Sequence, residues 1–173
     1  MKIFEAADRI PLAGERPAAT LGVFDGVHRG HRAIIEILLA AARKLSIPTL
    51  ALTFHPHPRA ALGLSVPPGI CSLKARLRLL EEAGLDAVWI LPFSREMSLL
   101  SGREFAAEFL FHRLAVRAVV MGGNAVFGRG RDGDAHSLAL WAAGRDILVS
   151  AVPPLPIHGA IISSTAVRLA VQM

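Results

Sequence analysis

Apolar positions along this chain follow two patterns, the spacing of one helix face and short continuous runs. Six apolar side chains recur at the spacing of one helix face, which predicts a helix over His31–Leu45. They are Ile34, Ile35, Leu38, Leu39, Ala42 and Leu45. Apolar runs on either side of this helix predict strands over Ala18–Val23 and Thr49–Phe54. The second run is apolar at nearly every position, as is typical of a parallel strand that is covered on both faces.

The same alternation continues toward the C-terminus. Helices are predicted over Leu73–Ala83, from Ser101 to about Arg113, over Ala135–Ala143 and from about Ser163. Strands are predicted over Ala87–Leu91, Arg117–Met121 and Ile147–Val152, and residues 1–17 leave room for one short edge strand. Proline and glycine mark His55–Pro58, residues 60–71 and Gly128–Gly133 as loops. Ser72 can cap one helix, and Ser101 and Glu104 have the spacing of a capping box.

Strands that alternate with helices predict a Rossmann-like three-layer α/β/α fold with a mostly parallel sheet. A length of 173 residues predicts a single domain. Ligands of such sheets bind beyond the carboxyl ends of the strands. We therefore expect the loops that follow Val23, Phe54, Met121 and Val152 to converge on one site.

The composition is that of a compact globular protein, with 53% hydrophobic and 19% charged residues. Charged residues interrupt every apolar run before it reaches the roughly 18–20 residues that cross a bilayer, so no membrane association is expected. The N-terminus lacks the layout of a signal peptide, and the single cysteine excludes an internal disulfide, which together predict a cytoplasmic protein. That cysteine, Cys71, is expected to be a small buried hydrophobe.

The net charge of +5 favours an anionic partner. The basic residues are scattered, however, and no aromatic residues are interleaved with them as a single-strand nucleic-acid platform requires. The pattern therefore favours a small nucleotide over a nucleic acid.

The strongest candidate for chemistry is the stretch Thr20–His31. His28 and His31 flank Gly30 where a strand end meets a helix start. A helix N-terminus has unpaired N–H groups and a partial positive charge of about half a unit, and glycine lets a ligand approach the backbone. Imidazole N–H groups can donate to phosphoryl oxygens without adding a permanent charge. The alternative is two exposed histidines in a loop, and the strand–turn–helix setting favours the phosphate site.

Three other segments at strand exits or helix starts leave two interpretations open. Thr53–Arg59 can form a stiff wall for a flat ring or a simple proline-rich turn, and the residues alone favour the turn. Asn124 can bind ATP and Phe127 can stack on a ring, or they can be a turn asparagine and a core phenylalanine. Residues 161–168 can form a second anion site or an ordinary capped helix, and their hydroxyls with Arg168 favour the anion.

The segment Gly22–His31 resembles the first motif of the adenylyltransferase module of bacterial bifunctional riboflavin kinase/FAD synthetases, which are His-x-Gly-His nucleotidyltransferases. The resemblance extends through Thr53–Arg59, Gly123–Gly128 and Ile162–Arg168, and so covers nearly the whole chain. It implies an FMN adenylyltransferase that makes FAD and pyrophosphate from ATP and FMN. Mg²⁺ would bridge the phosphates with few protein ligands, so no metal-binding residues are assigned. The family's riboflavin kinase module has no room in the 173 residues. Either a separate riboflavin kinase supplies FMN to a stand-alone FAD synthetase, or the sequence is an excised or shortened form.

The resemblance also assigns residues to roles. The catalytic residues are His28, His31, Asn124 and Arg168. ATP would contact Gly22, Val23, Phe24, Asp25, Gly30, Ser163, Ser164 and Thr165. The flavin would contact Phe54, Pro56, His57, Pro58, Arg59, Leu62, Phe105 and Phe127.

The chain departs from the family pattern at Ala125, Val126 and Ile161, where the family tends to have a phenylalanine, a polar residue and an arginine. Two alternatives therefore remain beside the FAD synthetase. One is a weakly active or inactive flavin- or nucleotide-binding protein on the same scaffold. The other is an adenylyltransferase for another phosphorylated acceptor.

Overall fold

A six-stranded sheet, in which every neighbouring pair of strands is parallel, forms the centre of the molecule. The computed structural model describes residues 1–5, 12, 15–157 and 160–171. The strands lie in the order β1 (Lys2–Glu5), β4 (Ala87–Leu91), β3 (Thr49–Phe54), β2 (Ala18–Leu21), β5 (Ala118–Gly122) and β6 (Leu148–Val152). The parallel sheet is thus confirmed, and the short strand expected in residues 1–17 is β1 at one edge.

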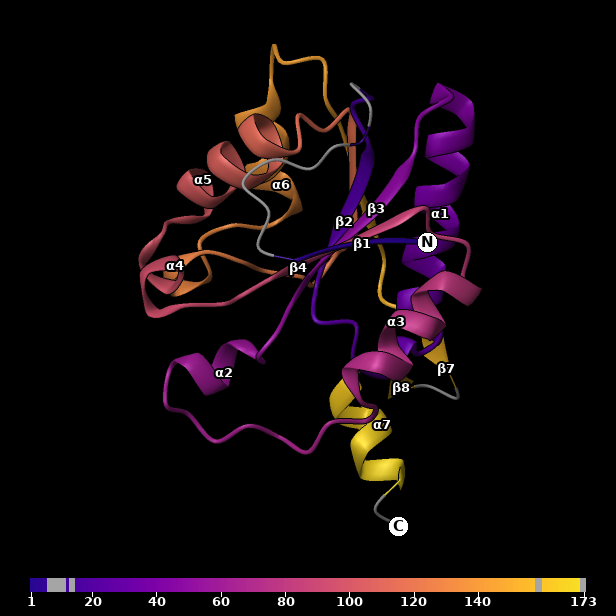
Figure 1. The fold of residues 1–173 in the computed structure, drawn as a ribbon, viewed down its shortest axis with the longest axis vertical. Helices are drawn as coiled ribbons and strands as arrows, with labels where there is room; N and C mark the ends of the chain where they lie inside the picture. The colour runs from indigo at the N-terminus through magenta and orange to yellow at the C-terminus, as the bar shows by residue number, and fades with distance from the viewer. Residues whose placement is uncertain (6–11, 13–14, 158–159, 172–173) are drawn as a thin grey trace.

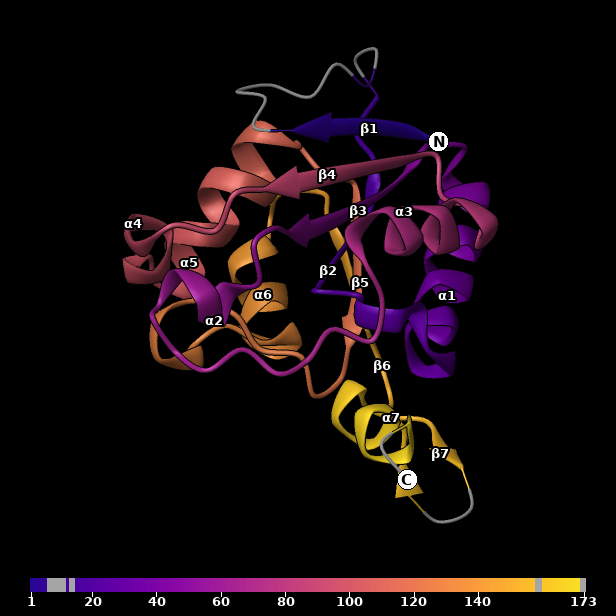
Figure 2. The ribbon, with the colours of Figure 1, turned by 60° about the horizontal axis from the view of Figure 1, so that its bottom comes forward.

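Helices cover both faces of this sheet (Figures 1 and 2). On one face lie α1 (Arg29–Leu45) and α3 (Leu73–Glu82), and on the other lie α5 (Gly102–Phe105), η2 (Ala106–Arg113) and α6 (Ala135–Ala142). Successive residues of a strand belong to two separate cores, one on each face of the sheet. Leu50 and Leu52 of β3 pack in the core that contains Phe105 and Leu110, whereas Ala51 packs on the α1 side. These two cores establish the predicted three layers.

The phosphate-candidate stretch forms a shorter strand and a longer helix than predicted. The strand β2 ends at Leu21 rather than Val23, because the chain turns at Phe24, which has a left-handed φ of 53°. The helix α1 begins at Arg29, two residues before His31. His28 is its N-cap, with Nδ1 accepting the N–H of His31 at 3.4 Å.

The predicted helix from Ser101 to Arg113 is present but not uniform. The capping box of Ser101 and Glu104 starts α5 as expected, and Phe105, Phe109 and Leu110 are buried on its inner side. From Ala106 onward the helix widens to the π form in η2. No sequence feature signalled this widening.

Several short elements were missed by the pattern. The helix α2 (Pro58–Ala61) and the turn η3 (Arg129–Arg131) lie in segments expected to be loops. The helix α4 (Arg95–Leu99) and the turn η1 (Asp25–Val27) lie between predicted elements. A hairpin of β7 (Pro156–Ile157) and β8 (Ala160–Ile161) precedes the last helix, α7 (Ser164–Val171). These missed elements are shorter than two helical turns or three strand residues, so they carry almost no periodicity to detect. Figure 2 shows α7 and the hairpin beyond the carboxyl edge of the sheet.

The structure also shows how far Cys71 is buried and how long and apolar the helices are. Cys71 is only partly buried, which corrects the expected core position, because it lies in a polar turn where its Sγ accepts the N–H of Gly26 at 3.3 Å. Within the described ranges, no helix has the length and hydropathy that a membrane span requires.

Candidate functional site

The turn after β2 is held in shape by a buried carboxylate. Asp25 is 3% exposed, and its oxygens accept the backbone N–H groups of Ile70 at 3.0 Å and Cys71 at 3.2 Å. Gly26 follows with a φ of 74°, a conformation that favours glycine. The turn is thereby tied to the segment that leads into α3, and it delivers His28 to the start of α1.

The two histidines form one stacked pair. The rings of His28 and His31 lie with centroids 3.7 Å apart at an interplanar angle of 17°, and the ring of Phe24 meets His31 edge-on at 5.2 Å. Burial lowers the pKa of His28, and burial together with the neighbouring His28 lowers the pKa of His31 to about 3. Both imidazoles are therefore neutral near pH 7, as the phosphate hypothesis requires.

A second helix start faces this pair, as the sequence predicted. Ser164, the first residue of α7, has its Oγ 3.3 Å from Nε2 of His28, and Ser163 accepts the N–H of Ala166 to cap the helix. A Cβ at Gly30 would lie 3.2 Å from the ring of His28. Glycine thus permits the close packing of the ring over the start of α1.

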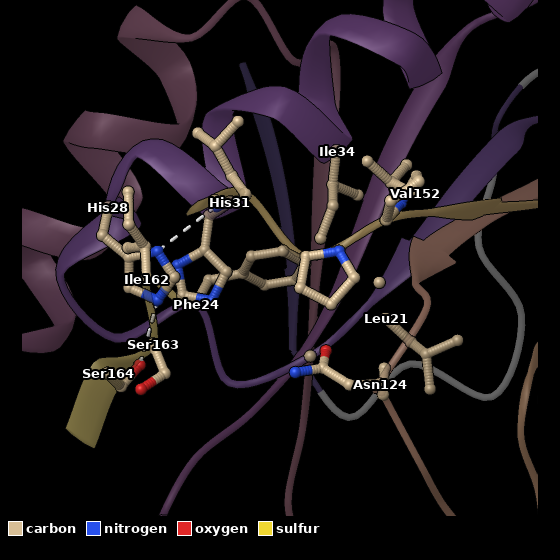
Figure 3. A pocket seen from close by; sticks show the side chains of 17 residues that line it. Leu21, Phe24, His28, His31, Ile34, Asn124, Val152, Ile162, Ser163 and Ser164 are labelled. Carbon is tan, nitrogen blue, oxygen red and sulfur yellow. Dashed lines mark hydrogen bonds between the residues drawn. The ribbon is translucent and has the colours of Figure 1, made fainter. Parts of the chain in front are cut away.

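A cavity of about 210 Å³ lies where these elements meet (Figure 3). We call it the polar cavity after the imidazoles, amide and hydroxyls that reach it, although apolar side chains make up more than half of its lining. It opens at the carboxyl ends of β2, β5 and β6 and at the starts of α1 and α7. The predicted residues that line it are Gly22, Phe24, His28, Gly30, His31, Asn124, Ser163 and Ser164. Nδ1 of His31 is buried there without a hydrogen-bond partner among the described residues, so a ligand can supply one.

A second, larger cavity of about 500 Å³ is mainly apolar, and we call it the aromatic cavity after the four phenylalanine rings in its lining. Of the predicted flavin residues, it is lined by Phe54, Pro58, Leu62, Phe105 and Phe127. Val23, predicted on the ATP side, lines this cavity instead. The two cavities share Leu21, Gly22 and Ala125 as a common wall. A ligand with a flat apolar part and a phosphate can therefore place one in each cavity.

Sequence reasoning missed other residues of the aromatic cavity, notably Phe93, Met97 and Val126. Phe93 precedes α4 and Met97 lies within it, and the pattern did not reveal this helix of 5 residues. One signal was available: β4 ends at the same edge of the sheet as β3, so the segment after Leu91 also had to reach this site.

Not every predicted site residue lines these two cavities. Pro56, His57, Arg59, Thr165, Asp25 and Arg168 are outside both linings. Nε of Arg59 donates to the carbonyl oxygen of Ser65 at 2.6 Å, and its backbone N–H donates to Nδ1 of His57.

Arg168 and Asp25 contact each other instead of the cavity. Nη2 of Arg168 lies 2.6 Å from Oδ2 of Asp25, and Nε of Arg168 donates to the carbonyl oxygen of Pro68 at 2.8 Å. Burial raises the pKa of Asp25, but hydrogen bonds from Ile70, Arg168 and Cys71 outweigh it and hold that pKa below its ordinary value. The pair ties α7 to the turn that carries the histidines.

The fold and this site define a Rossmann-like α/β protein with a cleft suited to phosphate groups at the carboxyl edge of its sheet. Residues 12–166 match the family model described as FAD synthetase. The chain belongs to the FAD synthetase family.

Two relatives show how much of the chain is shared. It is 36% identical over 154 residues to the bifunctional riboflavin kinase/FMN adenylyltransferase of Escherichia coli strain K12, covering 87% of this chain and 49% of the relative. It is 33% identical over 150 residues to the protein of the same name from Pseudomonas fluorescens, covering 87% and 48%. The chain spans about half the length of the curated relatives it matches.

Solved structures agree with the fold. A structure from Streptococcus pneumoniae described as a macrolide-efflux protein superposes with a TM-score of 0.85 at 27% identity, covering 98% of this chain and 57% of that one. Pantothenate synthetase from Thermus thermophilus has a TM-score of 0.63 at 19% identity, covering 96% and 67%. The second likeness concerns the fold alone.

Proposed function

We propose that this chain is an FMN adenylyltransferase, which transfers AMP from ATP to FMN and releases pyrophosphate. The observation that carries the proposal is the pair of adjacent cavities, which share lining residues. One is polar and faces two helix starts, the other is aromatic, and they share the wall at Gly22. The FAD synthetase family supports the same reaction.

In this reaction a phosphate oxygen of FMN attacks the α-phosphorus of ATP in line. The new bond joins this oxygen to the α-phosphorus, and the bond from the α-phosphorus to the bridging oxygen breaks as pyrophosphate leaves. We assign His28 and His31 to the charge that develops on the α- and β-phosphates. Neutral imidazoles and two helix starts stabilise that charge by fixed hydrogen-bond donors, without a covalent intermediate.

The remaining nucleotide contacts come from the loops around the polar cavity. Asn124 and the hydroxyls of Ser163 and Ser164 would hold ATP, with Gly22, Phe24 and Gly30 close to it. Arg168 and Asp25 would act by fixing α7 over the site, because they pair with each other at 2.6 Å. We therefore assign this pair a positioning role.

The isoalloxazine ring would occupy the aromatic cavity. Phe54, Leu62, Phe105 and Phe127 would enclose it, with Pro58, Phe93 and Met97 completing the lining. Pro56, His57 and Arg59 would form the outer wall beside α2. The ring-to-ring distances of 5.7 Å from Phe105 to Phe127 and 6.3 Å from Phe54 to Phe105 show that these aromatic residues form one cluster.

Magnesium would enter with the nucleotide as Mg·ATP. Asp25 is committed to Arg168 and two backbone N–H groups, and the described residues contain no cluster of three or more His, Cys, Asp or Glu side chains around a common point. Such a site suits a magnesium ion that is held mainly by the triphosphate oxygens. We further propose that the protein works in the cytoplasm and takes its FMN from a riboflavin kinase.

The direct test is to incubate the purified protein with Mg·ATP and FMN and to quantify FAD and pyrophosphate together. We expect the two products in equal amounts. Other phosphorylated acceptors, assayed in parallel, should yield no adenylylated product. Binding of FMN and ATP without pyrophosphate release, or faster transfer to another acceptor, would contradict the proposal.

A further inference from the structure

Arg76 on α3 is a buried cation without a matching anion. Its side chain is 8% exposed, although a guanidinium group stays charged at all ordinary pH values. Nη1 donates to the carbonyl oxygen of Phe54 over 3.4 Å, and Nε is buried without a partner among the described residues. The ion pairs found in the described ranges leave Arg76 out.

Arg76 lies close to a residue of each cavity. Its hydrogen-bond partner Phe54 lines the aromatic cavity and ends β3. His31 lines the polar cavity, and the charge of Arg76 adds to the burial that lowers the pKa of His31. The guanidinium group is therefore close to one lining residue of each compartment, although Arg76 itself is outside both linings.

The charges that act on the neighbouring side chain of His57 are mostly positive. Burial and the charges of Arg168, Arg76 and Arg59 lower the pKa of His57, whereas the charge of Asp25 raises it. That carboxylate already accepts from Arg168 and from the backbone of Ile70 and Cys71. A buried, uncompensated charge costs several kcal/mol of stability, so a chain that keeps one has a use for it.

We propose that Arg76 supplies the positive charge that binds the phosphate group of FMN. The inference rests on the proposed function, in which the flavin fills the aromatic cavity and its phosphate reaches the α-phosphorus in the polar one. That path brings a phosphate dianion past the shared wall of Leu21, Gly22 and Ala125, between the cavity that Phe54 lines and the one that His31 lines. A preorganised guanidinium group in a poorly solvated site binds such an anion strongly.

The test compares the variants R76M and R76K with wild type. Methionine fills a similar space without a charge, so R76M should unfold at the same temperature as wild type or a higher one. Its Kd for FMN, followed by flavin fluorescence, should rise about 10- to 100-fold, whereas R76K should lose less. The affinities for riboflavin, which lacks the phosphate, and for ATP should change by less than about twofold.

Arg78 provides the matched control on the same helix. Its side chain is 72% exposed and pairs with Glu82 at the surface, so R78M should leave every affinity unchanged. The inference is overturned if R76M binds FMN like wild type, or if it loses riboflavin and ATP as well. A lower unfolding temperature of R76M, with R76K restoring both stability and all affinities, would make Arg76 structural and overturn it too. A wild-type protein that forms no FAD refutes the proposed function instead, whatever the variants do.

Discussion

Nε2 of His28 lies 3.3 Å from Oγ of Ser164, although 136 positions separate the two residues in the sequence. This contact joins the N-cap of α1 to the first residue of α7. Each helix start directs unpaired N–H groups and a partial positive charge toward the same space. An anion placed there is stabilised by both helices at once, which is the physical basis of the proposed reaction.

The ion pair between Asp25 and Arg168 is expected to hold α7 in place. Removing either partner, in D25N or R168M, should lower the free energy of unfolding by about 3 kcal/mol, because the other partner loses its counter-charge in a poorly solvated site. The double variant should lose clearly less free energy of unfolding than the sum of the losses in the two single variants. The KM for ATP should rise in all three variants. Urea unfolding and steady-state kinetics measure both effects.

The surface pair of Arg78 and Glu82, with Nε and Oε1 3.3 Å apart, is the matched control for this cycle. Its coupling energy should be no more than about 0.5 kcal/mol, since both side chains are exposed. Strict additivity of the D25N and R168M effects would show that the two residues do not act as a pair.

Acid should destabilise the protein through His31. Its pKa falls from 6.5 in the unfolded chain to about 3 in the folded one, so between these values the unfolded state binds the extra proton. Stability should therefore fall as the pH drops below 6.5, by about 2 kcal/mol at pH 5 from this residue alone. Urea titrations at pH 7 and pH 5 should show this loss in wild type and a smaller loss in H31Q.

His112 supplies the control, because its side chain is 81% exposed and lies on η2, away from the site. H112A should retain the full wild-type pH dependence. An H31Q variant that loses as much stability as wild type between the two pH values would mean that His31 is not the group responsible.

The close approach at Gly30 predicts a variant that keeps its stability and loses activity. In G30A the new methyl group would meet the ring of His28 at 3.2 Å, while alanine favours the helix by about 1 kcal/mol. We expect an unfolding temperature no lower than that of wild type and a kcat at least about tenfold lower, because the ring must move. G69A, whose new methyl group would lie 3.4 Å from the carbonyl oxygen of Cys71, should keep its activity. Unchanged kcat in G30A would argue against a precise position for His28.

Met97 should contribute to the binding of the flavin and not to the binding of the nucleotide. It lines the aromatic cavity from α4, so M97A should raise the KM for FMN several-fold while the KM for ATP stays the same. Leu99 lies on the same helix with 59% exposure, and L99A should change neither constant. Equal effects of M97A on both substrates would place the flavin elsewhere.

The sequence predicted the longer helices and strands, in which the apolar pattern extends over enough residues to be recognised. The strands Thr49–Phe54 and Ala87–Leu91 were predicted residue for residue, and so was the convergence of His28 with Ser164. A parallel sheet brings its strand exits to one edge, so the position of the site followed once the alternation of strands and helices was read.

The features that the sequence could not show are those that depend on tertiary partners. Arg168 was predicted to contact phosphate, and the structure shows in addition that it pairs with a buried carboxylate on a distant turn. The sequence analysis made no prediction for Arg76, and only the packing of α3 shows that it is buried. Phe93 and Met97 lie around a helix too short to leave a periodic signal.

The central claim, that paired imidazoles and two helix starts act on one triphosphate, is tested most directly by the variant H28A/H31A. Formation of FAD from Mg·ATP and FMN should be measured in a single turnover, with circular dichroism to show that the variant is folded. Removing one such donor costs roughly 100- to 1,000-fold in rate, so the double variant should form no FAD above background. A folded double variant that makes FAD at a rate near that of wild type would contradict the account.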